Sequence, residues 1–122
     1  MNMGIKFFKI SVIYFVIAII LGIYMGIIDD FDLSPVHAHL NLLGWVSMAL
    51  FGTIYHFYPA AAETKLATTH FWLHNLGVPV FQGALALTIL TGDEVYAIPT
   101  IVGAIAVGLG GILFAVNVFR NL

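Results

Sequence analysis

The stretch FFKISVIYFVIAIILGIYMGII, residues 7–28, contains a single charged side chain, Lys9. A helix of about 20 predominantly apolar residues is long enough to cross the hydrocarbon core of a bilayer. Three further stretches share this character, and we expect helices over residues 36–58, 67–91 and 96–118 as well. With 61% hydrophobic and 8% charged residues and a mean hydropathy of +1.05, the chain cannot bury its apolar surface in one small soluble core. The sequence therefore predicts an all-α integral membrane protein.

The polar residues between these stretches predict how the helices are joined. The acidic run at residues 29–32 closes the first hairpin, and the run at residues 91–94 separates the third and fourth helices. Ser34 followed by Pro35 is typical of a helix N-cap with proline at the first helical position, and Pro59 ends the second helix. Because the loops are short, we expect residues 1–122 to form a single domain, an antiparallel four-helix bundle or arc.

The charged residues predict an orientation in the membrane. All four basic residues fall at one end of the expected arrangement: Lys6, Lys9, Lys65 and Arg120. Five of the acidic residues fall at the other end: Asp29, Asp30, Asp32, Asp93 and Glu94. Since basic residues favour the cytoplasmic side, we expect a protein of the plasma (inner) membrane with both termini in the cytoplasm. Lys6 and Lys9 precede the apolar run of the first stretch, as basic residues do in a signal peptide. The length of this run and the absence of a small-residue cleavage site favour a retained helix. The net charge of −2 does not indicate nucleic-acid binding.

The candidate chemistry depends on five histidines, because the chain has no cysteine. Disulfides, iron–sulfur clusters and c-type haem are thereby excluded. His37 and His39 lie near the outer end of the second helix and point in directions about 200° apart. His56, His70 and His74 lie toward the inner end. Histidines near a bilayer are functional candidates by default.

Each group of histidines has an alternative interpretation. Three imidazoles at the inner end suit copper or zinc, or His74 could ligate a second haem, whereas His56 and His70 could equally be interfacial side chains in an aromatic belt. One of the two outer histidines could simply bond to the carboxylates of the first loop. His39 and His74 should differ by about 20 Å in depth if both helices run straight, so we do not expect one chain to clamp a haem between them.

Several small or amide residues are candidates for packing. Gly44 and Gly52 would admit either a flat macrocycle or another helix. Small-residue pairs spaced four apart occur in the first and fourth helices, at Gly22 with Gly26, Ala104 with Gly108 and Ala106 with Gly110, and they favour close helix contact. Asn41 could orient His37 or bond across helices, and no motif supports a proton relay through Asn75 or Gln82.

Two segments resemble a known family. HLNLLGW (residues 39–45), continued by GTIYHFYP (residues 52–59), resembles the second transmembrane helix of the haem-copper oxidase catalytic subunit (subunit I), closest to the nitric oxide reductase and C-family branches. FWLHNLG (residues 71–77) resembles the third helix of that family, so the resemblance extends over about residues 36–90. In that family the histidine that precedes Asn-Leu-Leu is an axial ligand of the low-spin haem near the outer face. The resemblance therefore implies that His39 ligates a haem.

The chain also departs from that family. A full subunit has about twelve helices and takes its second low-spin ligand, its copper ligands and its active-site haem ligand from later helices, which have no counterpart in four. The resemblance therefore implies a haem b-binding module, and not a complete oxidase or nitric oxide reductase. We predict no catalytic residue, and whether the chain takes part in an enzyme depends on its partners.

The missing second ligand leads to a hypothesis about assembly. In a homo-oligomer, a trimer being favoured, His39 of one protomer would face His37 of its neighbour across a shared haem. Alternatively, another subunit of a respiratory complex supplies the ligand. Such a module would transfer electrons or sense oxygen or nitric oxide. The alternative function is a non-haem structural or assembly subunit of a respiratory complex, or a small membrane protein that binds a metal through histidines.

Overall fold

The computed structural model describes residues 2–122, and its regular structure is helical throughout that range. The first span is α1 (Met3–Ile28), and the second consists of α2 (Ser34–His39), a π-helical segment η1 (Leu40–Val46) and α3 (Ser47–Phe57). A short helix α4 (Pro59–Ala62) leads to α5 (Lys65–Thr91), and a 3-10 turn η2 (Glu94–Tyr96) leads to α6 (Ala97–Asn121). Four helices in this range are long and apolar enough to cross a membrane, which confirms the predicted fold class.

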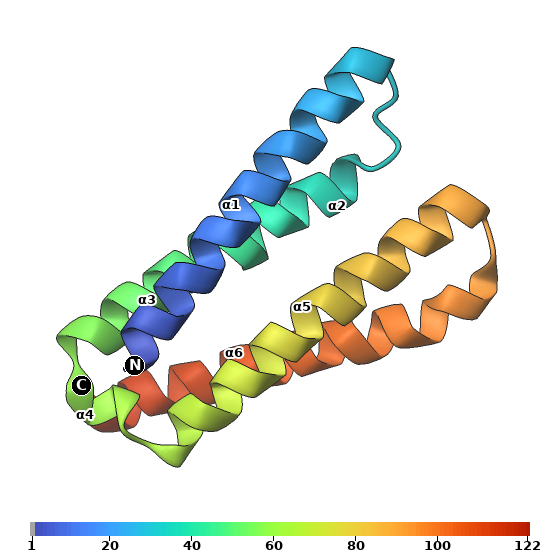
Figure 1. Cartoon of the computed structure of the whole chain (residues 1–122). Helices are drawn as coiled ribbons and strands as arrows, with labels where there is room; N and C mark the ends of the chain where they lie inside the picture. The colour runs from blue at the N-terminus through green and yellow to red at the C-terminus, as the bar shows by residue number, and fades with distance from the viewer. Residues whose placement is uncertain (1) are drawn as a thin grey trace.

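The four spans form two antiparallel hairpins (Figure 1). The helix α1 lies beside the second span, and α5 lies beside α6 over most of its length. Both termini and α4 lie at the same end of the molecule. The four basic residues therefore share the end that carries the termini, as the sequence predicts, and the side of the membrane that this end faces stays a prediction.

Three helix ends follow local capping rules, and one cap expected from the sequence does not form. Asn2 accepts a hydrogen bond from the Ile5 N–H at 2.9 Å and so caps α1, and Thr64 caps α5 by accepting from the Ala67 N–H at 3.1 Å. Gly92 ends α5 in the left-handed conformation with φ 69°, which a residue without Cβ adopts at no steric cost. The exception is Ser34, because its hydroxyl donates to the Phe31 carbonyl and Leu33 occupies the N-cap position. The prediction that Ser34 caps the second helix was therefore wrong.

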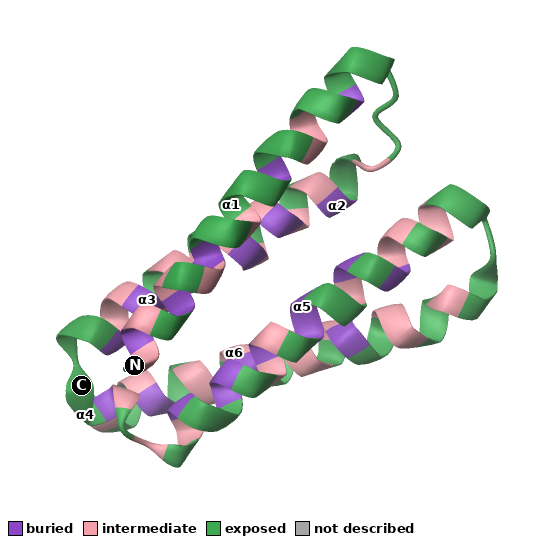
Figure 2. Cartoon of the chain, in the orientation of Figure 1, coloured by how far each residue is buried: buried purple, intermediate pink, exposed green. Residues whose placement is uncertain are grey.

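Many residues along the four spans are exposed (Figure 2). Much of this exposed surface is apolar, as expected for a protein surrounded by lipid. Large aliphatic side chains are exposed along α1 and α6, including Ile20 at 60% and Ile112 at 60%. Two buried clusters lie inside. One contains Phe7, Met48, Tyr55, Ala61, Ala67 and Phe71. The other contains Ala18, Val36 and Leu40, against which Leu85, Ala86 and Ile89 of α5 pack. In both clusters residues of the first hairpin pack against residues of the second, so the hairpins form one bundle.

Close helix contacts depend on glycines. A Cβ added at Gly52 would lie 3.0 Å from the Gly4 carbonyl oxygen, so α1 and α3 touch backbone to backbone. A Cβ added at Gly44 would overlap the Tyr14 ring. Both glycines thus face α1, which selects the helix-packing interpretation over approach of a macrocycle. In the four-spaced pairs, Gly26 and Gly108 have open space around them, so these two positions make no close helix contact within residues 2–122.

Candidate functional site

The two outer histidines face different helices, as their angular separation predicts. The His37 ring lies against α1, because a Cβ added at Gly22 would sit 2.8 Å from His37 Cε1. The His39 ring lies against α5, with its centroid 5.1 Å from that of Phe81. Asn41 donates its side-chain N–H to the His37 carbonyl at 3.0 Å, so it bonds within its own helix rather than to an imidazole or a neighbouring helix.

Both outer histidines retain unused nitrogens. His37 Nδ1 and His39 Nδ1 are buried and have no hydrogen-bond partner within residues 2–122. Each side chain is only half-buried overall. His39 Nε2 also makes no hydrogen bond in the same range. Unlike Nδ1 it is not buried, so it reaches the accessible surface. An imidazole nitrogen in that condition is free to bind a metal.

The backbone changes form immediately after His39. Leu40–Val46 is a π-helical segment inside an otherwise α-helical span. The Ser47 N–H that follows it bonds to the Leu42 carbonyl five residues earlier. Short π-helical insertions often occur at functional sites. Leu43 lies within this insertion, and its carbonyl is 2.8 Å from His74 Nε2, so His74 donates a hydrogen bond from α5 to the second span.

The inner histidine His70 is completely buried among aromatic rings. Its Nδ1 lies 2.8 Å from the Tyr55 hydroxyl, a bond that connects α5 to α3. The rings of Phe51, Phe114 and Phe7 lie 4.5, 5.2 and 5.3 Å from the His70 ring, centroid to centroid. His70 Nε2 has no partner within residues 2–122. This histidine therefore belongs to the core between the hairpins.

The three inner histidines do not come together. His70 and His74 share one face of α5 with ring centroids 6.0 Å apart. His56 is exposed and packs against the neighbouring Phe57 ring. In the part of the chain that the structure describes, no three His, Cys, Asp or Glu residues lie close enough to hold a metal ion. The copper or zinc site predicted at these histidines thus has no preformed cluster in residues 2–122.

The depth of His74 relative to His39 is smaller than the straight-helix estimate. His74 bonds to Leu43, which lies one helical turn, about 6 Å, beyond His39. His39 nevertheless stacks on Phe81, and His74 packs against Phe51 and His70. The two rings therefore do not form a facing pair.

Two buried amides complete the polar interior. Gln82 on α5 is 2% exposed, and neither its Oε1 nor its Nε2 has a partner within residues 2–122. Asn117 on α6 is fully buried and donates to the Ala61 carbonyl at 3.0 Å, which fastens α4 to α6. Asn117 was not among the candidate residues predicted from the sequence. The signal was available, because an amide in an otherwise apolar helix is expensive unless it is bonded.

Comparison with known proteins gives one partial match. The chain is 33% identical over 55 residues to the Cbb3-type cytochrome c oxidase subunit CcoN1 of Stutzerimonas stutzeri. The match includes 40% of this chain but only 12% of the length of that subunit. No family model and no solved structure matches the chain. This four-helix membrane protein therefore has a weak, partial similarity to a haem-copper oxidase subunit I.

Proposed function

We propose that this protein binds haem b in the membrane and that His39 is one axial ligand. The observation that carries the proposal is the condition of the His39 imidazole. Its Nδ1 is buried without a partner and its Nε2 reaches the accessible surface. His70 and His74, by contrast, each use one ring nitrogen in a hydrogen bond that holds two spans together. The likeness to part of an oxidase subunit I supports the same assignment.

The residues around His39 fit an imidazole ligand held at a defined angle. The Phe81 ring packs beside it, which limits its rotation. A bound haem would supply a one-electron redox couple if two imidazoles ligated its iron, or a gas-binding position if only one imidazole did. His39 would hold the iron through Nε2 and leave Nδ1 as the buried donor.

The second axial ligand comes from another chain in this proposal. His37 of the same chain lies on the opposite face of the helix, against Gly22. His74 is engaged with the Leu43 carbonyl. We propose assembly with further copies, a trimer being favoured, or with a partner subunit of a respiratory complex. In a homo-oligomer the neighbour's His37 would have to rotate away from its own α1 to reach the iron.

Haem titration of single-histidine variants tests the proposal. Purified protein is titrated with haemin, and the Soret band is compared among the wild type, His39→Ala, His37→Ala and His56→Ala. His56 is the matched control because it is exposed and lies at the other end of the same span. We expect His39→Ala to lose most of the band and His56→Ala to keep it.

The remaining outcomes separate the alternatives. Loss of haem in His37→Ala would favour a haem shared between identical chains, and an unchanged complement would favour a ligand from a different subunit. A normal Soret band in His39→Ala would refute the assignment of His39. If the wild type takes up no haem, the chain acts without haem, as a structural or assembly subunit.

A further inference from the structure

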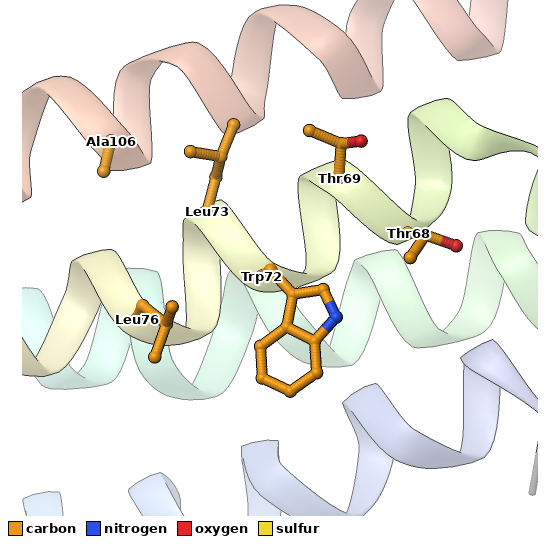
Figure 3. Close-up of a pocket in the computed structure, with 6 residues that line it drawn as sticks. All are labelled: Thr68, Thr69, Trp72, Leu73, Leu76 and Ala106. Atoms are coloured by element: carbon orange, nitrogen blue, oxygen red, sulfur yellow. The ribbon is translucent and has the colours of Figure 1, made fainter.

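An apolar groove lies on the outside of the hairpin that α5 and α6 form (Figure 3). Its volume is about 440 Å³. It is lined by Thr68, Thr69, Trp72, Leu73, Leu76 and Ala106. Trp72 and Leu76 are 56% and 61% exposed, so the groove opens to the surroundings of the protein rather than into its core.

The groove extends over the depth of one lipid leaflet. Residues 68–76 lie about 5 to 17 Å along the helix axis from Lys65, where α5 begins. Half of a hydrocarbon core of about 30 Å is a similar length. An acyl chain that enters at the membrane surface would therefore follow the groove to the middle of the bilayer.

The surface end of the groove carries a positive charge. Lys65 lies on the same helix face as Thr69, Trp72 and Leu76, at spacings of three or four residues. Its side chain is exposed. Lys6, at the same end, instead has its ammonium 5.7 Å from the centre of the Phe71 ring. Lys65 is thus available to an external anion.

A hydrogen-bond donor lies two helical turns from Lys65 on the same face of α5. The indole nitrogen of Trp72 is on the side of its ring that faces Thr68, toward the Lys65 end of the helix (Figure 3). The hydroxyls of Thr68 and Thr69 donate to the carbonyls of Thr64 and Lys65. Among Lys65 and the residues that line the groove, these bonds leave the Lys65 ammonium and the Trp72 N–H as donors, and each can bind a phosphate oxygen.

We propose that this groove binds an anionic phospholipid, with an acyl chain against Trp72, Leu76 and Ala106 and the phosphate beside Lys65. The net negative charge of the headgroup complements Lys65, whereas a zwitterionic headgroup carries its own ammonium. One lysine near an anionic headgroup favours it by about fivefold. The site is independent of the haem proposal, because none of its residues contacts His39 or His37.

Quenching of Trp72 fluorescence by brominated lipid tests this site. Trp45→Phe leaves Trp72 as the single tryptophan, and the protein is reconstituted in phosphatidylcholine vesicles with brominated phosphatidylglycerol or brominated phosphatidylcholine. We expect about fivefold stronger association of the glycerol lipid. Lys65→Gln should reduce this ratio to about one, and the matched control Lys9→Gln, an exposed lysine at the same end on α1, should leave it unchanged. Ala106→Leu fills the groove and should weaken quenching by the anionic lipid.

Three results would overturn the proposal. Equal quenching by both lipids would show that the headgroup is not recognised. Equal loss in Lys65→Gln and Lys9→Gln would reduce the effect to general surface charge. Trp72 shielded from both lipids would show that a second copy or another protein covers the groove.

If Trp45→Phe does not fold, native mass spectrometry of the wild type and Lys65→Gln measures the same preference. The measured quantity is then the ratio of retained phosphatidylglycerol to retained phosphatidylcholine.

Discussion

Replacing Gly103 by alanine should separate α5 from α6 where they are in closest contact. A Cβ at this position would lie 2.7 Å from Phe81 Cα and closer still to Phe81 N. Both of these atoms are backbone, so no side-chain rotation relieves the overlap. Ordinary contact of a Cβ begins near 3.4 Å, so the two helices must move apart by about 0.7 Å or more at this point.

The expected cost follows from the packing lost along this contact. A radial gap of about 0.5 to 1 Å removes a quarter to a half of each dispersion contact. Overpacking of a well-packed interior costs roughly 1–3 kcal/mol. The gain in helix propensity from glycine to alanine, about 0.5–1 kcal/mol, offsets part of this. We therefore expect Gly103→Ala to lower the free energy of unfolding by about 1–2 kcal/mol.

Unfolding by SDS in mixed micelles measures this difference, with Gly108→Ala as the matched control. Gly108 lies on the same helix, and nothing is within 4 Å of a Cβ placed there. The control should be neutral or more stable by up to about 1 kcal/mol, because only the propensity gain remains. If Gly103→Ala is as stable as Gly108→Ala, the close approach of α5 and α6 at Phe81 does not exist.

Three further substitutions probe the polar interior by the same unfolding measurement. Gln82→Leu should stabilise the protein by about 1 kcal/mol or more, since it removes a buried amide that has no partner, and a destabilised variant would indicate a bonded Gln82. Tyr55→Phe should cost about 0.6–2 kcal/mol by leaving His70 Nδ1 without its partner, and an unchanged ¹⁵N shift of that nitrogen would contradict the bond. His74→Phe should cost a similar amount through loss of the bond to the Leu43 carbonyl, and a neutral result would place His74 elsewhere.

The fold could be predicted from the sequence because each span is long and apolar, and because the loops between them are short. The stretch at residues 7–28 illustrates this, since its composition alone requires a membrane helix. Pro59 has a restricted backbone and Gly92 a permissive one, and each was expected to mark the end of a helix. In the structure α3 ends just before Pro59, and α5 ends just before Gly92. Ser34 shows the limit of such rules, because its hydroxyl had a backbone carbonyl of the preceding turn within reach.

The candidate site was less accessible to sequence reasoning because it depends on contacts between distant residues. The opposite directions of His37 and His39 follow from helical angles alone and agree with their positions against α1 and α5. The π-helical segment after His39 has no composition signal, and it contains Leu43, whose carbonyl accepts the bond from His74. The burial of His70 also depends on which face of α5 meets the first hairpin, and the spacing of histidines cannot determine this.

The reduced-minus-oxidised optical spectrum of the protein, purified from haem-replete cells, tests the central claim most directly. Ligation of haem b by His39 predicts a Soret band and an α-band of haem b, both lost in His39→Ala and kept in His56→Ala. A wild-type protein that folds and carries no haem, or a His39→Ala protein with an unchanged α-band, would contradict it.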